Sequence, residues 1–380
     1  MRGVKRAAGT CSQFRPIGAL LIALSFFFTS SKALAQSAEA NVAGQATPRS
    51  ILDAVSQNQN ELLAREVQSG TSGAGTVGVG AFASGRLKTS ENDGLGIRDI
   101  VLLPGEPPGV KTFAYRTEEA SAFANVVIAI PGTVLGGQLK FSGFVGHNWL
   151  SLNLKSNAVK VLDPNQSGSA ENGSVIAGWT ALWASQGTYA LATIVGAWGQ
   201  TKLVDSVGDC FPGGCNVNRY TYNTTGLIGN FTAGRVVALS ASPSGPMLDL
   251  RGSVGYTWND GDRFLNVNGD EFQVKFSTWS GKVAATLFAN WALPNSAVLR
   301  PFVQGYIRQD WAYHHELAFT QSGTGDRSLT AYDQGHTYPG LDAGLTYAFQ
   351  NMTLGSAVYV EGSSNERTLG GRVSASWKLN

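Results

Sequence analysis

The sequence predicts a transmembrane β-barrel of about twelve antiparallel strands, and three observations support this fold class. Only 14% of the 380 residues are charged, whereas a typical soluble protein has about 25%. The mean hydropathy is nevertheless close to zero, at −0.04, as expected where strands alternate lipid-facing and lumen-facing residues. In addition, short and long connections alternate along the chain, as they do when periplasmic turns are tight and external loops are long.

Residues 1–35 are expected to be a signal peptide. Arg2, Lys5, Arg6 and Arg15 precede an apolar stretch over residues 17–28. The small-x-small pattern of a cleavage site then follows at residues 33–35. A membrane anchor is the alternative, but the apolar stretch is shorter than the roughly 20 residues that a spanning helix needs. We therefore expect an exported chain from which this segment is removed.

Residues 36–73 are predicted to contain a short polar segment followed by an amphipathic helix. The segment up to Pro48 is small and polar, which is typical of disorder. Thr47 would be the N-cap and Pro48 the first residue of the helix. Over residues 50–67, apolar side chains recur roughly on one face, at Ile51, Leu52, Val55, Leu62 and Leu63.

Residues 74–380 are predicted to form the barrel, because apolar residues recur there with a period of two. A soluble β-sandwich also has strands in which apolar and polar residues alternate. Its strands, however, average about 5–6 residues, and its connections do not alternate between short and long. Residues 118–125, where the second strand is predicted to begin, could form a helix instead of a strand. The twelve predicted strands are residues 76–88, 120–130, 137–152, 173–183, 188–204, 222–241, 247–258, 276–293, 298–313, 338–349, 352–362 and 368–379.

The alternation also predicts which side chains face lipid and which face the lumen. Aromatic rings near strand ends on the apolar faces are expected to form a girdle at the membrane boundaries: Trp258, Trp291, Trp311, Tyr347, Phe349 and Trp377. The opposite faces carry nine charges: Asp249, Arg251, Lys282, Arg300, Arg308, Asp310, Asp342, Glu361 and Arg372. These charges would either line water or pair across the lumen and with the helix. Pairing is favoured, because enclosed charges without partners are costly.

Two further sets of residues are candidate sites. Cys210 and Cys215 lie close together in a turn-rich external loop, which favours a disulfide in an oxidising compartment. His314, His315 and Glu316 are expected in another external loop. They are a weak metal candidate, because zinc needs three or four convergent ligands. No cofactor and no enzymatic constellation is indicated, and a net charge of +2 gives no support for nucleic-acid binding.

Three segments share loose patterns with a known family: residues 299–306 (LRPFVQGY), 340–345 (GLDAGL) and 370–380 (GGRVSASWKLN). Together they make residues 173–380 resemble the translocator β-barrel of autotransporters. The resemblance implies a twelve-stranded barrel, threaded by an N-terminal helix, that exports or displays a passenger. The predicted helix over residues 50–67 stands where that helix would be.

The chain also departs from this family. Only residues 36–75 separate the signal from the first predicted strand, so no large β-helical passenger is expected, and no self-cleavage motif stands out. The last aromatic residue, Trp377, is followed by three more residues, whereas the family usually ends in an aromatic residue that the barrel-assembly machinery recognises.

Two functions are compatible with the sequence. One is an outer-membrane barrel, resembling a translocator, that displays surface loops or a very short passenger. The other is a small passive solute channel. The expected partners are outer-membrane lipid and, through the C-terminal strand, the barrel-assembly machinery. The barrel is expected to be monomeric.

Overall fold

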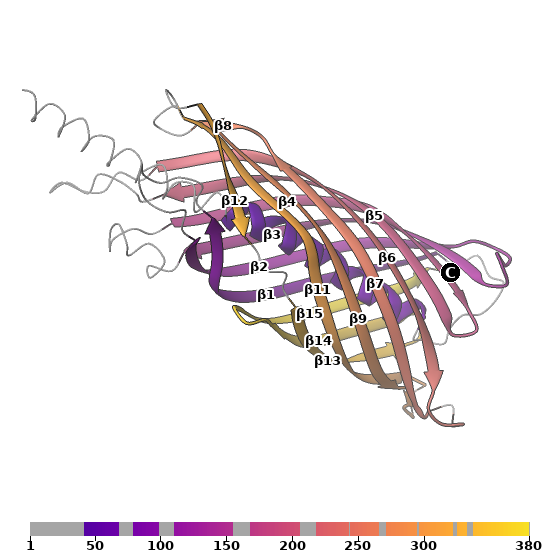
Figure 1. Cartoon of the computed structure of the whole chain (residues 1–380). Helices are drawn as coiled ribbons and strands as arrows, with labels where there is room; N and C mark the ends of the chain where they lie inside the picture. The colour runs from indigo at the N-terminus through magenta and orange to yellow at the C-terminus, as the bar shows by residue number, and fades with distance from the viewer. Residues whose placement is uncertain are drawn as a thin grey trace, which may run out of the picture.

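The computed structural model describes residues 42–67, 79–98, 110–154, 168–205, 218–242, 244–265, 271–294, 296–321, 325–332 and 337–379. Within them, twelve long antiparallel strands form a ring around one helix, which is drawn in indigo in Figure 1. The strands of the ring are β1 (Val79–Arg98), β2 (Val110–Ala129), β3 (Gln138–Leu154), β4 (Gly168–Ser185), β5 (Thr188–Asp205), β6 (Asn218–Ala238), β7 (Pro246–Gly261), β9 (Glu271–Ala289), β11 (Val298–Gln321), β13 (Thr337–Phe349), β14 (Met352–Gly362) and β15 (Glu366–Leu379). Three short strands accompany them: β8 (Phe264–Leu265), β10 (Trp291–Ala292) and β12 (Gly325–Tyr332).

Each long strand pairs with the next long strand in sequence, and β15 pairs with β1 from Leu379↔Val79 to Glu366↔Asn92. The sheet is therefore closed, which removes free edges as a spanning barrel requires. The predicted fold class is confirmed, and all twelve predicted strands are present. The second is a strand and not a helix, and several strands extend beyond their predicted outer ends.

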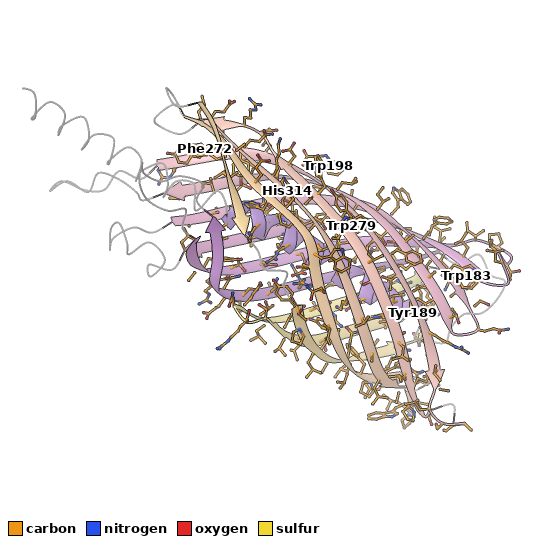
Figure 2. The ribbon with its side chains drawn as sticks, viewed as in Figure 1. Trp183, Tyr189, Trp198, Phe272, Trp279 and His314 are labelled. Atoms are coloured by element: carbon orange, nitrogen blue, oxygen red, sulfur yellow. The ribbon has the colours of Figure 1, made fainter. Side chains whose placement is uncertain are left out.

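Side chains alternate between the outside and the lumen along each strand. On β2, the positions from Ala120 to Ile128 that face outward are apolar, and Glu118 follows them on the same face. A spanning strand needs about 9–11 residues, so Glu118 marks the outer boundary of the membrane there. Trp198 and Trp279, labelled in Figure 2, are about half exposed on this outside surface. No helix among the described residues is long and apolar enough to span a membrane.

The outer rim contains a hairpin that was predicted to be a loop. β11 continues to Gln321 and pairs with β12, whose other neighbour is the outer end of β1. Because β13, β14 and β15 lie between β11 and β1 in the ring, the hairpin bridges the rim above these shorter strands (Figure 1). His314 and His315 therefore lie in a strand and not in a loop. A register shift between Trp311 and His314 points His314 outward and buries His315.

The lumen helix, residues 42–66, begins earlier than predicted. Thr47 and Pro48 lie inside it, and residues 42–48 are helical and not disordered. A proline inside a helix removes one backbone hydrogen bond, but here the first turns are enclosed by the barrel. Val42, Ala43 and Thr47 are almost fully buried, so packing against the wall outweighs the local helix-breaking signal.

A lumen-facing tyrosine packs tightly against a glycine on the next strand. Tyr306 of β11 faces Gly340 of β13, and a Cβ atom at Gly340 would lie 2.1 Å from the Tyr306 ring. The same ring carries the Lys282 ammonium group 3.7 Å from its centroid. Glycine at this position therefore gives the ring the space to lie flat along the wall.

We expect Gly340→Ala to lower the free energy of unfolding by about 1–3 kcal/mol, the usual cost of overpacking, because the ring must move away from Lys282. Gly305→Ala is the matched control, since a Cβ there meets nothing within 4 Å. The urea midpoints of the two purified variants test this. Equal midpoints would show that the ring relaxes without cost.

Candidate functional site: the filled lumen

The lumen helix runs from the outer mouth of the barrel down to the periplasmic end. Near its start, Gly44 packs against Val274 and His315, which lie toward the outer ends of β9 and β11. Near its end, Arg65 donates a hydrogen bond to the Ala81 carbonyl (3.0 Å), close to the start of β1. The helix therefore begins in the outer mouth and ends close to the periplasmic start of β1.

One side of the helix packs against an apolar half of the lumen. Three clusters follow one another from the outer mouth to the periplasmic end. The first surrounds Val42, Ala43 and Ala46; the second surrounds residues 51–55; the third surrounds Leu62 and Leu63. The wall contributes mainly side chains of β2 to β6, including Leu152, Leu203, Phe123, Phe144, Ile176, Ile228, Leu182 and Leu191.

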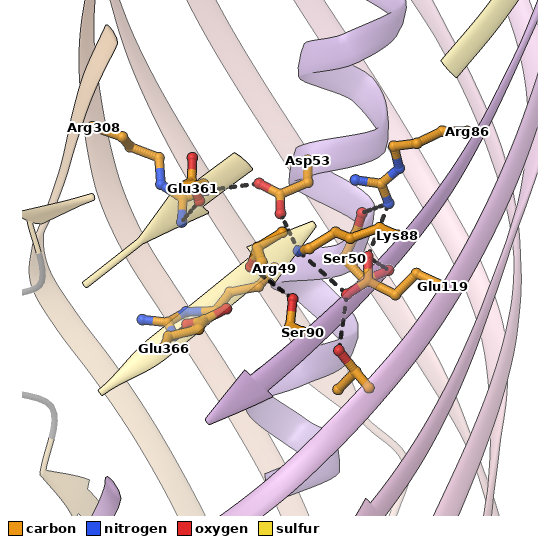
Figure 3. Close-up of polar contacts among 12 residues, drawn as sticks. Arg49, Ser50, Asp53, Arg86, Lys88, Ser90, Glu119, Arg308, Glu361 and Glu366 are labelled. Carbon is orange, nitrogen blue, oxygen red and sulfur yellow. Dashed lines mark hydrogen bonds and ion pairs between the residues drawn. The ribbon is translucent and has the colours of Figure 1, made fainter. Parts of the chain in front are cut away.

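The other side of the helix carries an ionic network, shown in Figure 3. Asp53 accepts hydrogen bonds from Lys88 of β1 (2.6 Å) and from Arg308 of β11 (2.7 Å). Arg308 also pairs with Glu361 of β14 at 3.0 Å. Lys88 pairs in addition with Glu119 of β2 at 3.3 Å. The Asp53 carboxylate thus bonds to strands on both sides of the β1–β15 seam.

Ser50, one turn earlier, extends this network to β2 and β3. Its hydroxyl donates to Glu119 (2.9 Å) and accepts from Asn148 of β3 (2.9 Å). Arg86 donates both to Glu119 (2.9 Å) and to the Ser50 carbonyl (3.2 Å). Arg49 pairs with Asp310 at 3.7 Å. All these side chains are largely buried, so each charge depends on its partners in the lumen.

A second group of contacts holds the middle of the helix to β15. Arg372 donates to Glu61 (2.6 Å) and to Gln57 (3.0 Å), and it also pairs with Asp342 of β13. Ser374 donates to the second oxygen of Glu61 (2.8 Å). A cavity of about 20 Å³ lies beside Glu61 and Arg372, which is space for about one water molecule.

The last turn of the helix is held near the periplasmic rim. Arg300 of β11 donates to the Ala64 carbonyl (2.9 Å), where the helix leaves backbone acceptors unsatisfied. Lys140 of β3 pairs with Glu66 at 2.7 Å. The helix is thus attached to the wall at both ends and in the middle.

The structure places all nine sequence-predicted charges on the lumen side of the wall: Asp249, Arg251, Lys282, Arg300, Arg308, Asp310, Asp342, Glu361 and Arg372. Six of them contact a charged side chain or a backbone carbonyl of the helix or reach it through one partner, as described above. Asp249 and Arg251 instead pair with each other at 3.4 Å, and Asp249 also accepts a hydrogen bond from Tyr189.

Sequence reasoning missed the helix residues Arg49, Asp53 and Glu61 and the wall residues Arg86, Lys88 and Glu119. A signal for the wall residues exists. Arg86 and Lys88 alternate with the apolar Leu87, and Glu119 shares one face of β2 with Ser121 and Phe123. Arg86 and Lys88 are the last lumen-facing positions of the predicted strand over residues 76–88, and Glu119 lies one residue before the predicted strand over residues 120–130.

The other sequence-predicted residues have these positions. Trp258, Trp291, Trp311 and Trp377 are exposed on the outside of the barrel, and Tyr347 and Phe349 are partly exposed there. Cys210 and Cys215 lie outside the described residues. His314 lies 3.6 Å from Glu316. Within the described part of the chain, no group of three or more His, Cys, Asp or Glu residues is placed to hold a metal ion.

Comparison with known proteins gives structural matches only. No protein-family model matches the chain, and a search of curated protein sequences finds no match. Among solved structures, the translocator domain of the autotransporter NalP from Neisseria meningitidis has a TM-score of 0.58 at 15% identity, covering 86% of this chain and 97% of that one. The β domain of the Bordetella autotransporter BrkA has a TM-score of 0.54 at 12% identity, covering 80% and 100%.

The transport unit of the autotransporter AIDA-I from Escherichia coli is similar too, with a TM-score of 0.53 at 13% identity, covering 86% of this chain and 98% of that one. These identities are low, so the likeness concerns the fold. The resemblance predicted from the sequence is confirmed at that level: the chain has the fold of an outer-membrane translocator barrel.

Proposed function

We propose that this protein is an outer-membrane anchor of translocator type that holds the chain preceding its lumen helix at the cell surface. The observation that carries this proposal is the direction of the helix. Its first residue lies in the outer mouth, and its last turn is bonded near the periplasmic start of β1. Any segment joined to residue 42 therefore starts on the external side.

The contacts of the helix support a permanent plug and not a mobile one. Its apolar side is buried against one half of the wall, and its charged side is paired with the other. Removing one partner of a buried ion pair costs about 3–5 kcal/mol, and helix release would break several such pairs. A passive solute channel would need the helix to leave, so the geometry favours display. The proposed function is non-enzymatic.

The proposed partners follow from the outer surface and the last strand. Lipid surrounds the apolar belt, and β15 presents Val373 and Trp377 outward for recognition by the barrel-assembly machinery. No nucleic acid is involved, and the barrel acts as a monomer.

An epitope inserted between residues 36 and 41 tests the proposal. On intact cells it should bind antibody, as should a control epitope at Ser364 in the external turn between β14 and β15. An epitope at Gly187, in the periplasmic turn between β4 and β5, should bind only after the membrane is permeabilised. If the N-terminal epitope behaved like the one at Gly187, display would be excluded.

A further inference from the structure

A hollow of about 1030 Å³ lies on the outside of the barrel wall, across strands β14, β15 and β1 to β5. Most of its lining side chains point away from the lumen. Leu87, Val358 and Leu369 are more than half exposed, and Trp149 is about half exposed. The hollow is therefore separate from the filled lumen and faces the membrane.

Strand pairing arranges this lining in two parallel rows. In the first, successive register partners lead from Val358 on β14 through Leu87 on β1 and Trp149 on β3 to Gln200 on β5. In the second, they lead from Leu369 on β15 through Glu118, Ser151 and Glu171 to Lys202. Both rows change from apolar at β14 and β15 to polar at β4 and β5.

Along each row, from β14 and β15 to β5, successive residues also lie closer to the cell exterior. Val358 lies six residues from the periplasmic start of β14 at Met352, whereas Gln200 lies twelve residues from the start of β5 at Thr188. With a rise of about 3.3 Å per residue and a tilt of about 45°, six residues correspond to roughly 15 Å of height. The apolar end of the hollow thus lies within the bilayer, and the polar end lies at its outer boundary.

The polar end offers several kinds of contact at once. Lys202 and Glu171 are register partners with exposed side chains, and neither has a side-chain partner among the described residues. Glu118 is already paired with Arg116 at 3.0 Å. The Trp149 ring is held against His147, with centroids 4.1 Å apart. An ammonium group suits a phosphate, a carboxylate accepts hydrogen bonds from hydroxyl groups, and the flat Trp149 ring can cover the face of a sugar.

The geometry points to a binding site for a phosphorylated glycolipid of the outer leaflet. Its phosphate contacts Lys202, its sugar hydroxyls donate to Glu171, and a sugar ring lies on Trp149. Its acyl chains descend along Leu87 and Val358. The hollow is apolar at its end within the bilayer and polar at its outer end, so it matches a molecule whose polar and apolar parts are separated along its length. This binding is independent of what the barrel displays.

Native mass spectrometry of the purified full-length barrel tests the site. The probe is a hexa-acylated, bis-phosphorylated glucosamine disaccharide lipid, and the comparison lipid is phosphatidylglycerol. We expect the wild-type barrel to retain the glycolipid preferentially. Lys202→Gln should weaken retention about tenfold, the effect of losing one charge-assisted hydrogen bond. Trp149→Leu should weaken it as well.

Lys275→Gln is the matched control, because Lys275 is an exposed, outward-facing lysine near the outer end of β9 on the opposite wall. It should leave retention unchanged. The unfolding midpoint of each variant confirms that the barrel is folded. Equal loss in Lys202→Gln and Lys275→Gln would reduce the effect to general surface charge and overturn the site. Equal retention of phosphatidylglycerol and glycolipid would overturn the sugar contacts, and undiminished retention in both site variants would overturn the proposal.

Discussion

Deleting residues 42–67 should change the barrel from a closed state to a conducting one in planar bilayers. The lumen helix is about 10 Å wide and is enclosed along its whole described length. A twelve-stranded barrel emptied of such a helix leaves a water path. The exposed Lys88, Arg308 and Arg372 side chains would then line that path with Glu119 and Glu361.

The measurement is single-channel conductance of the purified deletion variant beside the wild type. Deleting residues 36–41 instead is the control, because it shortens the chain and keeps the helix. Conductance should rise in the first variant and stay low in the second. Low conductance in both, with an intact barrel shown by heat-dependent gel mobility, would mean that loops or wall side chains close the pore without the helix.

Asp53→Ala should destabilise the folded barrel strongly, by about 3–5 kcal/mol. The substitution leaves Lys88 and Arg308 buried without the carboxylate that they share, at 2.6 and 2.7 Å. Their remaining carboxylate partners are Glu119 and Glu361, and Glu119 is already shared with Arg86. Removing the Asp53 carboxylate therefore weakens the ion pairing on both sides of the lumen.

Glu118→Ala is a control of the same chemical type. Its pair with Arg116 is similarly short, at 3.0 Å, but the two side chains are 60% and 51% exposed. An exposed pair contributes about 0–1 kcal/mol. Urea unfolding followed by tryptophan fluorescence compares the two variants. A midpoint shift in Asp53→Ala no larger than that in Glu118→Ala would show that water or helix movement compensates for the lost carboxylate.

The wall of the barrel could be predicted from the sequence, because its signal is local. Along residues 247–258, lipid-facing Leu250 and Val254 alternate with lumen-facing Asp249 and Arg251, and this pattern depends only on the two-residue period of a strand. The strand ends were less predictable. Beyond the membrane both faces become polar, so the alternation that marks β1 and β2 fades before these strands end.

The filling of the lumen could be predicted only in part. The helix was found from its apolar face, but its start was wrong, because Pro48 gave a local signal that packing of residues 42–46 overrides. The pairing of Asp53 with Lys88 and Arg308 joins residues that are 35 and 255 positions apart. No periodicity relates such positions, so the partners of each charge become visible only once the ring of strands is closed.

The contacts of the lumen helix have a consequence for assembly. The seam that closes the ring joins β1 to β15, the first and last strands of the barrel. The helix is bonded to both sides of that seam: Asp53 to Lys88 on β1, and Glu61 to Arg372 and Ser374 on β15. The helix therefore holds β1 and β15 together from inside the lumen. A chain in which β15 has not yet paired with β1 lacks the contacts of Glu61 with Arg372 and Ser374, so the last contacts of the helix form together with the closure of the ring.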